Sequence, residues 1–191
     1  VSATLSVDDK MDYFINTLGI NQVENTKKII KPIYNYKSRV QVINTTDIGG
    51  YKGEDFIPNM ADNIKQYVKL SNSNVLSLFN SKKRLEDTYN ILADDLYETN
   101  INVYMNKKGI KCLKNAEDKS IVLGSKGFFE GVDVPGDGLV FVTLDKLPNL
   151  NPTDPLYFSI MTKFNKNYFD VNYPQMIIKV KQALGRLLRS K

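Results

Sequence analysis

The sequence contains no histidine and a single cysteine, Cys112, and both scarcities exclude kinds of chemistry. Without histidine, the chain has no imidazole for acid–base catalysis, nucleophilic catalysis or metal binding. One cysteine cannot form a disulfide within the chain, and alone it cannot hold zinc or an iron–sulfur cluster. This low cysteine content is typical of a reducing compartment, so we expect a cytoplasmic protein.

Long hydrophobic segments are also lacking. No apolar run approaches the roughly 18 residues that cross a membrane, so we expect no membrane partner. The N-terminus does not show the order of a basic stretch, an apolar segment and a cleavage site that marks a signal peptide. Because the chain starts with Val1 and stops within a predicted helix, we expect it to be a piece of a longer protein.

The residues that are present suit one globular domain with a mild positive charge. The chain has 191 residues, of which 42% are hydrophobic and 25% are charged, which is enough apolar content for a buried core. Lysine and arginine number 26 against 21 acidic residues, giving a formal net charge of +5. This charge indicates a weak preference for polyanions and identifies no partner alone.

Short apolar segments bounded by polar or glycine-rich stretches predict buried strands. The clearest are NVLSLF at 74–79, SIVLG at 120–124 and LVFVTL at 139–144. The alternating segment SRVQVINT at 38–45 predicts another strand, and VSATL at 1–5 is typical of the end of one.

Amphipathic segments between these strands predict helices. Ser6 is expected to cap a first helix with Asp8 and Asp9 in its first turn. Gly19 is its expected stop. Further helices are expected over about 58–70, after the cap Ser81, from near Asp154, and over about 174–190. Strands that alternate with helices indicate an α/β fold, in which a parallel sheet is covered by helices on both faces.

The ends of the strands are the places where a ligand site is expected. In parallel sheets ligands bind at the carboxyl ends of the strands, which places the junctions at 79–81 and 124–133 in a candidate site. Gly124 and Ser125 leave their strand as small residues that would allow a phosphate backbone to approach closely.

The glycine-rich loop after that strand has two interpretations. GSKGFFEGVDVPG at 124–136 could be a flexible turn with Glu130 and Asp133 as solvated acids. Phe128 and Phe129 would be out of place in such a turn, and they favour a functional loop whose carboxylates orient other groups.

The segment KQALGRLLRSK at 181–191 ends the predicted terminal helix. At about 100° per residue, Gln182, Arg186 and Arg189 lie on one exposed face, opposite a leucine stripe. Stabilisation of basic residues by the helix dipole is one explanation. Gly185 in the middle of a helix costs about 1 kcal/mol relative to alanine, which favours close packing of a ligand or a facing domain. Planar guanidinium groups match phosphate oxygens well.

Four segments, in order along the chain, resemble motifs III, IV, V and VI of superfamily 2 helicases. They are VSATL at 1–5, VLSLFNSKKRL at 75–85, GSKGFFEGVDVPGDGL at 124–139 and QALGRLLRS at 182–190. The likeness is to the DinG/XPD branch, whose motif V has the form (F/W)-x-E-G-(V/I)-D-x-P-G and whose motif VI has the form Q-x-x-G-R-x-x-R. LDKLPNLNPTDPLY at 144–157 resembles the leucine–proline segment of that branch. The resemblance implies that residues 1–191 are the second RecA-like motor domain, of the P-loop NTPase type, in a DinG-type helicase.

The resemblance also implies roles for particular residues. Arg186 and Arg189 would be arginine fingers that reach the γ-phosphate of ATP held by the first motor domain. Gln182 and Gly185 would support the nucleotide site. Residues implied in coupling ATP to DNA are Ser2, Thr4, Glu130, Gly131 and Asp133. Residues implied in contacts to the phosphates of single-stranded DNA are Ser81, Gly124 and Ser125.

ATP and Mg²⁺ are the implied cofactors, and no metal ligand is expected in this chain. The chain contains no G-x-x-x-x-G-K-[ST] phosphate loop, D-E-A-H box or four-cysteine cluster, which the family places in the first motor domain. The implied partners are single-stranded DNA and that first RecA-like domain. The complete protein would be an ATP-dependent DNA helicase, a hydrolase of DNA repair. The fragment alone, which also lacks the family's final strand, is expected to hydrolyse no ATP.

Two departures from the family pattern concern local contacts. Phe129 stands where the family usually has tryptophan, and Asn149 stands where it has phenylalanine. The alternative functions are an RNA-acting superfamily 2 motor and a nucleic-acid-binding module without ATPase activity. The F-x-E-G-V-D-x-P-G form favours the DNA branch over the first, and the presence of both arginines argues against the second.

Overall fold

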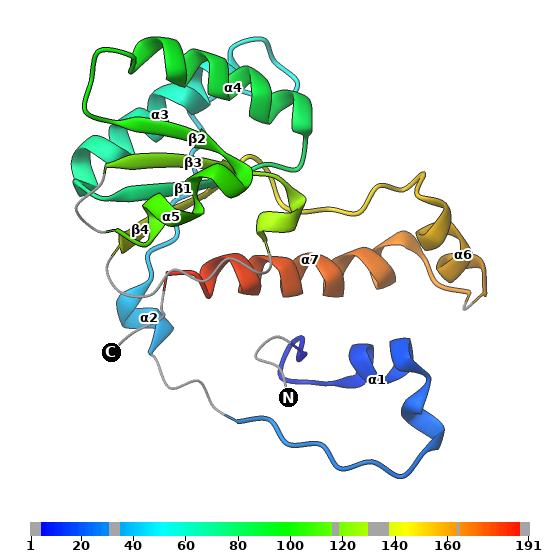
Figure 1. Ribbon diagram of the computed structural model, residues 1–191. Helices are drawn as coiled ribbons and strands as arrows, with labels where there is room; N and C mark the ends of the chain where they lie inside the picture. The colour runs from blue at the N-terminus through cyan, green and yellow to red at the C-terminus, as the bar shows by residue number, and fades with distance from the viewer. Residues whose placement is uncertain (1–4, 31–34, 116–118, 130–137, 164, 188–191) are drawn as a thin grey trace. The chain divides into compact units, whose positions relative to one another are not determined.

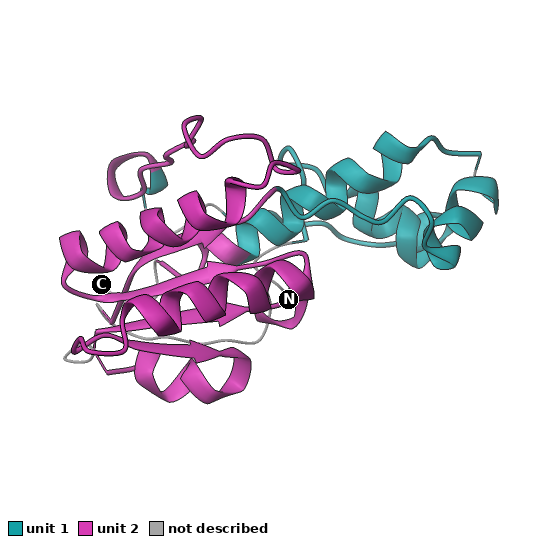
Figure 2. Cartoon of the chain, turned by 90° about the horizontal axis from the view of Figure 1, so that it is seen from above, with its two compact units in different colours: residues 1–36, 147–182 teal, residues 37–146, 183–191 magenta. Residues whose placement is uncertain are grey.

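The computed structural model describes residues 5–30, 35–115, 119–129, 138–163 and 165–187. The chain divides into two compact units. Unit 1 consists of residues 1–36 and 147–182, and unit 2 consists of residues 37–146 and 183–191 (Figure 2). Each unit is therefore built from two separate stretches of sequence.

Unit 2 is organised around a parallel sheet of four strands (Figure 1). The strands are β1 (Asn74–Leu78), β2 (Asn102–Met105), β3 (Ser120–Gly124) and β4 (Leu139–Leu144). Their order across the sheet is β2-β3-β1-β4, and every pairing is parallel. Leu76 of β1 is in register with Val122 of β3 on one side and Val142 of β4 on the other.

The two faces of the sheet bury different residues because successive side chains of a strand point to opposite sides. Val75 and Phe79 from the β1 segment lie in one apolar cluster, while Leu76 and Leu78 lie in the other. All five residues of β1 and of β3 are buried, as expected for strands covered on both sides.

Helices α3 (Phe56–Ser71) and α4 (Lys82–Asp95) cover one face of the sheet (Figure 1). α3 buries residues at a spacing of about one turn: Phe56, Met60, Ala61, Ile64 and Val68. α4 buries Leu85 and Leu92, and Leu96 follows directly after it. The amphipathic helix predicted after Ser81 is confirmed.

Short segments cover the second face. They are the 3₁₀ turn η2 (Asn106–Gly109), helix α5 (Ile110–Leu113), the 3₁₀ turn η3 (Lys126–Phe128) and the end of helix α7 (Tyr168–Leu184). Leu113, Phe128, Phe129 and Ala183 are buried there against the strands. The sheet is thus flanked by helices on both faces, as predicted.

The amino end of the sheet is fastened by one buried side chain, Asn74. Its Oδ1 accepts a hydrogen bond from the backbone N–H of Ser120 (2.9 Å). Its Nδ2 donates to the carbonyls of Asn115 (2.9 Å) and Gly138 (2.8 Å). The start of the central strand is thereby joined to its neighbours on both sides.

Unit 1 contains α1 (Asp12–Leu18), the 3₁₀ turn η1 (Ile20–Gln22), α6 (Pro155–Lys163) and most of α7. Asn172 Oδ1 accepts from the backbone N–H of Leu150 (2.8 Å), and the Tyr168 hydroxyl donates to the Leu150 carbonyl (2.8 Å). Gln175 Nε2 donates to the Tyr13 hydroxyl (2.6 Å). These bonds join the 147–182 segment to itself and to α1. Among the described residues, no helix is both long and apolar enough to cross a membrane.

Three local predictions made from the sequence are wrong. Residues 38–45 form no strand; the short helix α2 (Tyr36–Arg39) precedes an irregular stretch. The first helix begins at Asp12 because Asp8 and Asp9 adopt positive φ angles (51° and 56°) in a turn closed by Val7 and Lys10. Its predicted stop at Gly19 is confirmed by a left-handed φ of 70°.

The third error concerns the terminal helix. α7 begins at Tyr168, and Pro174 lies inside it, where the sequence predicted a start. The helix ends at Leu184, and residues 185–187 form a turn. Gly185 therefore follows the helix, and the argument for a destabilising glycine in mid-helix does not hold.

Candidate functional site

The carboxyl ends of the four strands carry the polar residues that the sequence pointed to, together with others that it did not. Because the strands are parallel, these ends meet at one edge of the sheet (Figure 1). Asn80 and Ser81 follow β1, Asn106 follows β2, Ser125 follows β3 and Asp145 follows β4. All of them belong to unit 2.

Ser81 is the N-cap of α4, as predicted. Its backbone is extended, and its Oγ accepts a hydrogen bond from the N–H of Arg84 (3.4 Å). The exposed residues Lys82 and Lys83 occupy the first turn of the helix. The positive end of the helix dipole and two lysines therefore lie directly after β1, a combination that favours an anion.

Gly124 ends β3, and packing explains why no side chain stands there. A Cβ at this position would lie 2.5 Å from the Cβ of Phe128, which is closer than real Cβ atoms approach. The Gly124 carbonyl accepts from the N–H of Phe79 (2.8 Å). The close neighbour of Gly124 is thus the chain's own Phe128, whereas the sequence suggested a phosphate.

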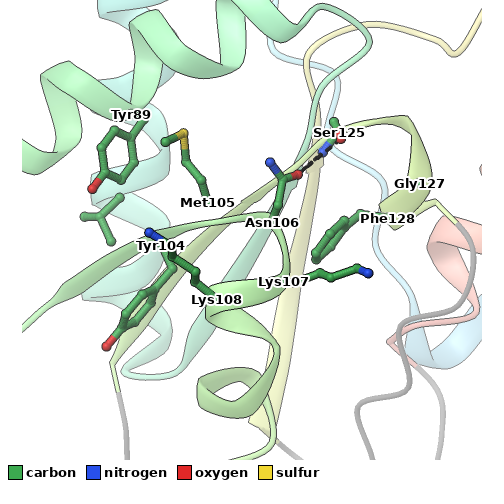
Figure 3. Close-up of a pocket in the computed structure, with 10 residues that line it drawn as sticks. Tyr89, Tyr104, Met105, Asn106, Lys107, Lys108, Ser125, Gly127 and Phe128 are labelled. Carbon is green, nitrogen blue, oxygen red and sulfur yellow. Dashed lines mark hydrogen bonds between the residues drawn. The ribbon is translucent and has the colours of Figure 1, made fainter.

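Both hydrogen-bond donors of Ser125 are engaged by Asn106. The backbone N–H and the Oγ of Ser125 each lie 3.1 Å from Asn106 Oδ1 (Figure 3). Asn106 has a left-handed φ of 53°, a conformation that asparagine tolerates better than most residues. The predicted contact of Ser125 with a phosphate would therefore require an exchange of this bond.

A hollow of about 650 Å³ lies beside this pair, at the ends of β2 and β3 (Figure 3). Its lining comes from α4, β2, the turn after β2, and the start of the 125–128 segment. The lining residues are Tyr89, Val103, Tyr104, Met105, Asn106, Lys107, Lys108, Ser125, Gly127 and Phe128. Two lysines and several apolar side chains thus share one concave surface.

A second polar group lies at the ends of β1 and β4, around the buried carboxylate of Asp145. Asp145 Oδ1 accepts from the backbone N–H and the Nδ2 of Asn80, both at 3.0 Å. Its Oδ2 accepts from the Tyr51 hydroxyl (3.3 Å). The Arg84 guanidinium stacks 3.9 Å from the centre of the Tyr51 ring and donates to the Tyr51 carbonyl. The loop before α3 is thereby held against the strand ends.

The ionisation of Tyr51 is affected by this environment. Burial raises the pKa of the Tyr51 phenol above its ordinary value, and the nearby negative charge of Asp145 raises the pKa further, with Arg84 opposing. The neutral phenol is thus the form that the fold favours.

Arg186 is buried, which corrects the prediction that it lies on an exposed helical face. Only 5% of the residue is exposed, and it lies in the turn after α7. Its Nη2 donates to the backbone carbonyl of Phe129 (2.8 Å). This bond joins the region of motif VI to the region of motif V within unit 2, which the sequence alone did not indicate.

The structure places the remaining predicted residues only in part. Gln182 lies in the last turn of α7, and Gly185 lies in the turn that follows. The other predicted residues fall outside the described ranges: Ser2, Thr4, Glu130, Gly131, Asp133 and Arg189. Within those ranges, no group of three or more acidic, cysteine or histidine side chains could hold a metal ion.

The sequence did not predict the residues that follow β2 at this edge of the sheet. The strand NVYM begins with an exposed polar residue and has only four residues, so it gave no clear apolar run. Without that strand, Asn106, Lys107 and Lys108 had no assigned place. The asparagine–lysine–lysine sequence before Gly109 was the available signal.

This architecture, a parallel sheet between helices with its polar groups at the carboxyl ends of the strands, is that of a RecA-like α/β domain. The profile of the family described as "Helicase C-terminal domain" matches residues 64–191, and the chain belongs to that family. Its likeness to DinG proteins extends over the whole chain, so this is a DinG/XPD-like helicase C-terminal domain.

Three relatives illustrate the likeness. Two proteins named "3'-5' exonuclease DinG", from Staphylococcus epidermidis and Bacillus subtilis, are each 29% identical to the chain, over 195 and 203 residues and 99% of its length. A protein of the same name from Staphylococcus haemolyticus is 27% identical over 199 residues, covering the whole chain. The chain spans 22% of the length of each of these relatives.

Proposed function

We propose that this chain is the second motor domain of an ATP-dependent, DinG-type DNA helicase, and that it contacts single-stranded DNA and contributes arginines to ATP hydrolysis. The observation that carries the DNA part is the arrangement at one sheet edge. Ser81 and Ser125 each follow a buried strand there, and basic side chains adjoin both of them. Such groups bind a phosphate backbone without reading its sequence.

The helix end at Ser81 supports a phosphate contact. Exposed Lys82 and Lys83, together with the free N–H groups of the first turn of α4, would attract a phosphate of the strand. At Ser125, the hydroxyl would turn from Asn106 Oδ1 to a phosphate oxygen, while the backbone N–H would keep its bond to Asn106. Gly124 would act through packing, because Phe128 fills the space beside it.

Arg186 and Arg189 would stabilise the negative charge that develops when the γ-phosphoryl group is transferred. Arg186 would have to leave the carbonyl of Phe129 to do so, which makes its action dependent on a local rearrangement. Gln182 and Gly185 would shape the same region. ATP, when bound by another domain, supplies the phosphoryl group, and we assign Mg²⁺ to that domain because the phosphate loop that binds Mg²⁺–ATP is not in this sequence.

Glu130 and Asp133 would couple the two activities, because in sequence they closely follow Phe129, whose carbonyl Arg186 contacts. We therefore expect Asp133→Ala, in the complete protein, to reduce the stimulation of ATPase activity by single-stranded DNA more than the basal rate. The measurement is phosphate release with and without oligothymidylate. Equal losses in both rates would contradict a coupling role.

The proposed function is tested by assaying ATP hydrolysis by the complete protein with single-stranded DNA, with RNA and with no nucleic acid. Stimulation by DNA is the expected result. Stimulation by RNA alone would favour an RNA-acting motor, the alternative left open by the sequence. Binding of nucleic acid with no ATP turnover would instead favour an interaction module.

A further inference from the structure

The hollow at the ends of β2 and β3 presents a hydrogen-bond donor whose orientation is fixed. The backbone N–H of Ser125 can only donate, so the atom of Asn106 that faces it must be the oxygen. The amide nitrogen therefore lies on the side away from Ser125, as Figure 3 shows. Because Asn106 lines the hollow, its two N–H groups are available to an acceptor there.

The same hollow carries positive charge without a compensating acid. Lys107 and Lys108 are exposed, and no aspartate or glutamate is among the described residues that line the hollow. In the described part of the chain, neither lysine takes part in an ion pair. An anion that enters the hollow therefore meets two cations and the Asn106 amide.

The apolar residues that line the hollow indicate which kind of ligand it can bind. Tyr89 and Met105 contribute half-buried side chains to the lining on one side of β2, whereas Tyr104 lies on the other side (Figure 3). Tyrosine rings offer faces on which a nucleobase can stack, and a thioether adapts to flat partners. A volume of about 650 Å³ lies within the range of small-molecule sites, so one nucleotide can be accommodated.

We propose that this hollow binds one nucleotide of a single-stranded DNA, with the base against Tyr89 and Met105 and the phosphate on Lys107 and Lys108. The Asn106 Nδ2 donates to an acceptor on the base. The inference rests on the proposed function and extends it, because contacts at Ser81 and Ser125 involve the backbone of the strand, whereas this subsite holds a base. The strand would thereby be anchored at one base in addition to its phosphates.

The first experiment measures binding of fluorescent oligothymidylate to the complete protein. Asn106→Asp keeps the oxygen that accepts from Ser125 and the tolerance for positive φ, but it replaces the donor nitrogen with a negatively charged oxygen. We expect binding to weaken by about tenfold or more, since the new carboxylate cannot donate to the base and repels the phosphate of the strand. Asn102→Asp is the matched control, because it adds the same charge at an exposed position of the neighbouring strand β2, outside the hollow.

The second experiment separates the base from the phosphate. Tyr89→Leu keeps an apolar side chain but removes the aromatic face. It should weaken binding of oligothymidylate and leave unchanged the binding of an abasic oligonucleotide of the same length. The double variant Lys107→Gln, Lys108→Gln should weaken the binding of both oligonucleotides. It should also reduce the slope of log K against the logarithm of the salt concentration by about 1–2. Lys111→Gln with Lys114→Gln is its control, as both lysines are exposed and outside the lining.

The possible outcomes test the nucleotide subsite separately from the proposed helicase function. If the unaltered protein binds oligothymidylate and none of the hollow variants differs from its control, the subsite is refuted while the helicase function stands. If the unaltered protein binds no single-stranded DNA, the proposed function fails. Equal weakening of abasic and base-containing strands by Tyr89→Leu would show that no base is bound in the hollow. If thymidine monophosphate alone binds with the same sensitivity to Asn106→Asp, the occupant is a free nucleotide and the strand assignment is wrong.

Discussion

At the scale of single residues, the carboxylate of Asp145 shows how a buried charge is retained. It is only 6% exposed, and three donors from Asn80 and Tyr51 surround it. A buried carboxylate without such donors would strongly destabilise the fold. The site edge is therefore positioned by a hydrogen-bonded acid that lies in the leucine–proline segment and outside motifs III to VI.

Tyr51→Phe tests this contact through its pH dependence. The variant loses the hydrogen bond to Asp145, and we expect the free energy of unfolding to fall by about 1–2 kcal/mol near neutral pH. Because the folded pKa of Tyr51 is raised, the stabilisation is complete below the ordinary tyrosine value of about 10 and is lost as pH rises through the folded pKa. Urea unfolding of both proteins between neutral and alkaline pH measures the difference.

The control for this prediction is Tyr97→Phe, since Tyr97 is 87% exposed. It should change stability little at any pH. A difference between wild type and Tyr51→Phe that stays constant into the alkaline range would show that the phenol does not act through its proton.

Arg186 and Arg189 give a second test at this scale. In the complete protein, alanine at either position should reduce ATP turnover by about 10³-fold or more if both act on the transferred phosphoryl group. Arg186→Ala should also lower the free energy of unfolding, because it removes a buried charged donor from the carbonyl of Phe129. Arg39→Ala, at an exposed position, is the control. Near-normal turnover in both variants would leave Arg186 as a purely structural anchor.

At the scale of elements, the segment after β3 is fixed by packing. Phe128 and Phe129 are 6% and 2% exposed, and Phe128 lies against Gly124. Gly124→Ala should therefore lower the free energy of unfolding by about 1–3 kcal/mol, because the neighbouring atom is a Cβ that cannot swing away. Urea denaturation provides the measurement.

Gly50→Ala is the matched substitution, because nothing lies within 4 Å of an added Cβ at Gly50 and its φ is not positive. It should change the free energy of unfolding by less than about 0.5 kcal/mol. If both glycine variants were equally stable, Phe128 would have to be movable at little cost, and its role as an anchor would be refuted.

The elements differ in how well the sequence predicted them, and the reason is physical. The sequence predicted β1, β3 and β4 because each is a run of apolar residues. It predicted α4 from an amphipathic segment, and Leu85 and Leu92 of that helix are buried. In these elements the residues that look apolar in the sequence are the ones that the fold buries. The segment at 38–45 alternates like a strand but finds no partner strand among the described residues. β2 forms because β3 pairs with it, and that non-local contact overrides its weak local preference.

The residues of the candidate site differ in the same way: those next to predicted strands could be predicted, and those placed by distant contacts could not. Ser81 and Ser125 were predicted because each directly follows a strand that the sequence shows. The partner of Ser125, Asn106, lies 19 positions away after the strand that was missed. The burial of Arg186 depends on the carbonyl of Phe129, 57 positions earlier, and no periodicity reports a contact of that kind.

At the scale of the whole molecule, the isolated chain of 191 residues should fold but hydrolyse no ATP. Two apolar clusters flank the sheet and supply a core, while the sequence has no phosphate loop that could hold ATP. Weak binding to single-stranded DNA that falls with salt is the most that we expect. The purified chain is incubated with ATP and oligothymidylate, and phosphate release is compared with a buffer blank.

The control for this assay is the same chain with Arg186→Ala. Steady phosphate release above the blank that is unchanged in this variant would contradict the assignment of the chain as a second motor domain. Release that requires Arg186 would instead show that the chain contains a complete catalytic centre of its own.

The division of each unit into two stretches has a consequence for the order of events during synthesis. Residues 5–30 of unit 1 leave the ribosome before the whole sheet of unit 2, and their partners at 147–182 follow only after it. One face of the sheet can be covered early, since α3 and α4 are near in sequence to β1 and β3. Part of the second face is covered only by Ala183 and Leu187, which come late in the chain. A nascent chain paused after β4 would thus expose that part of the apolar face, and chaperones that bind such surfaces would have their longest opportunity there.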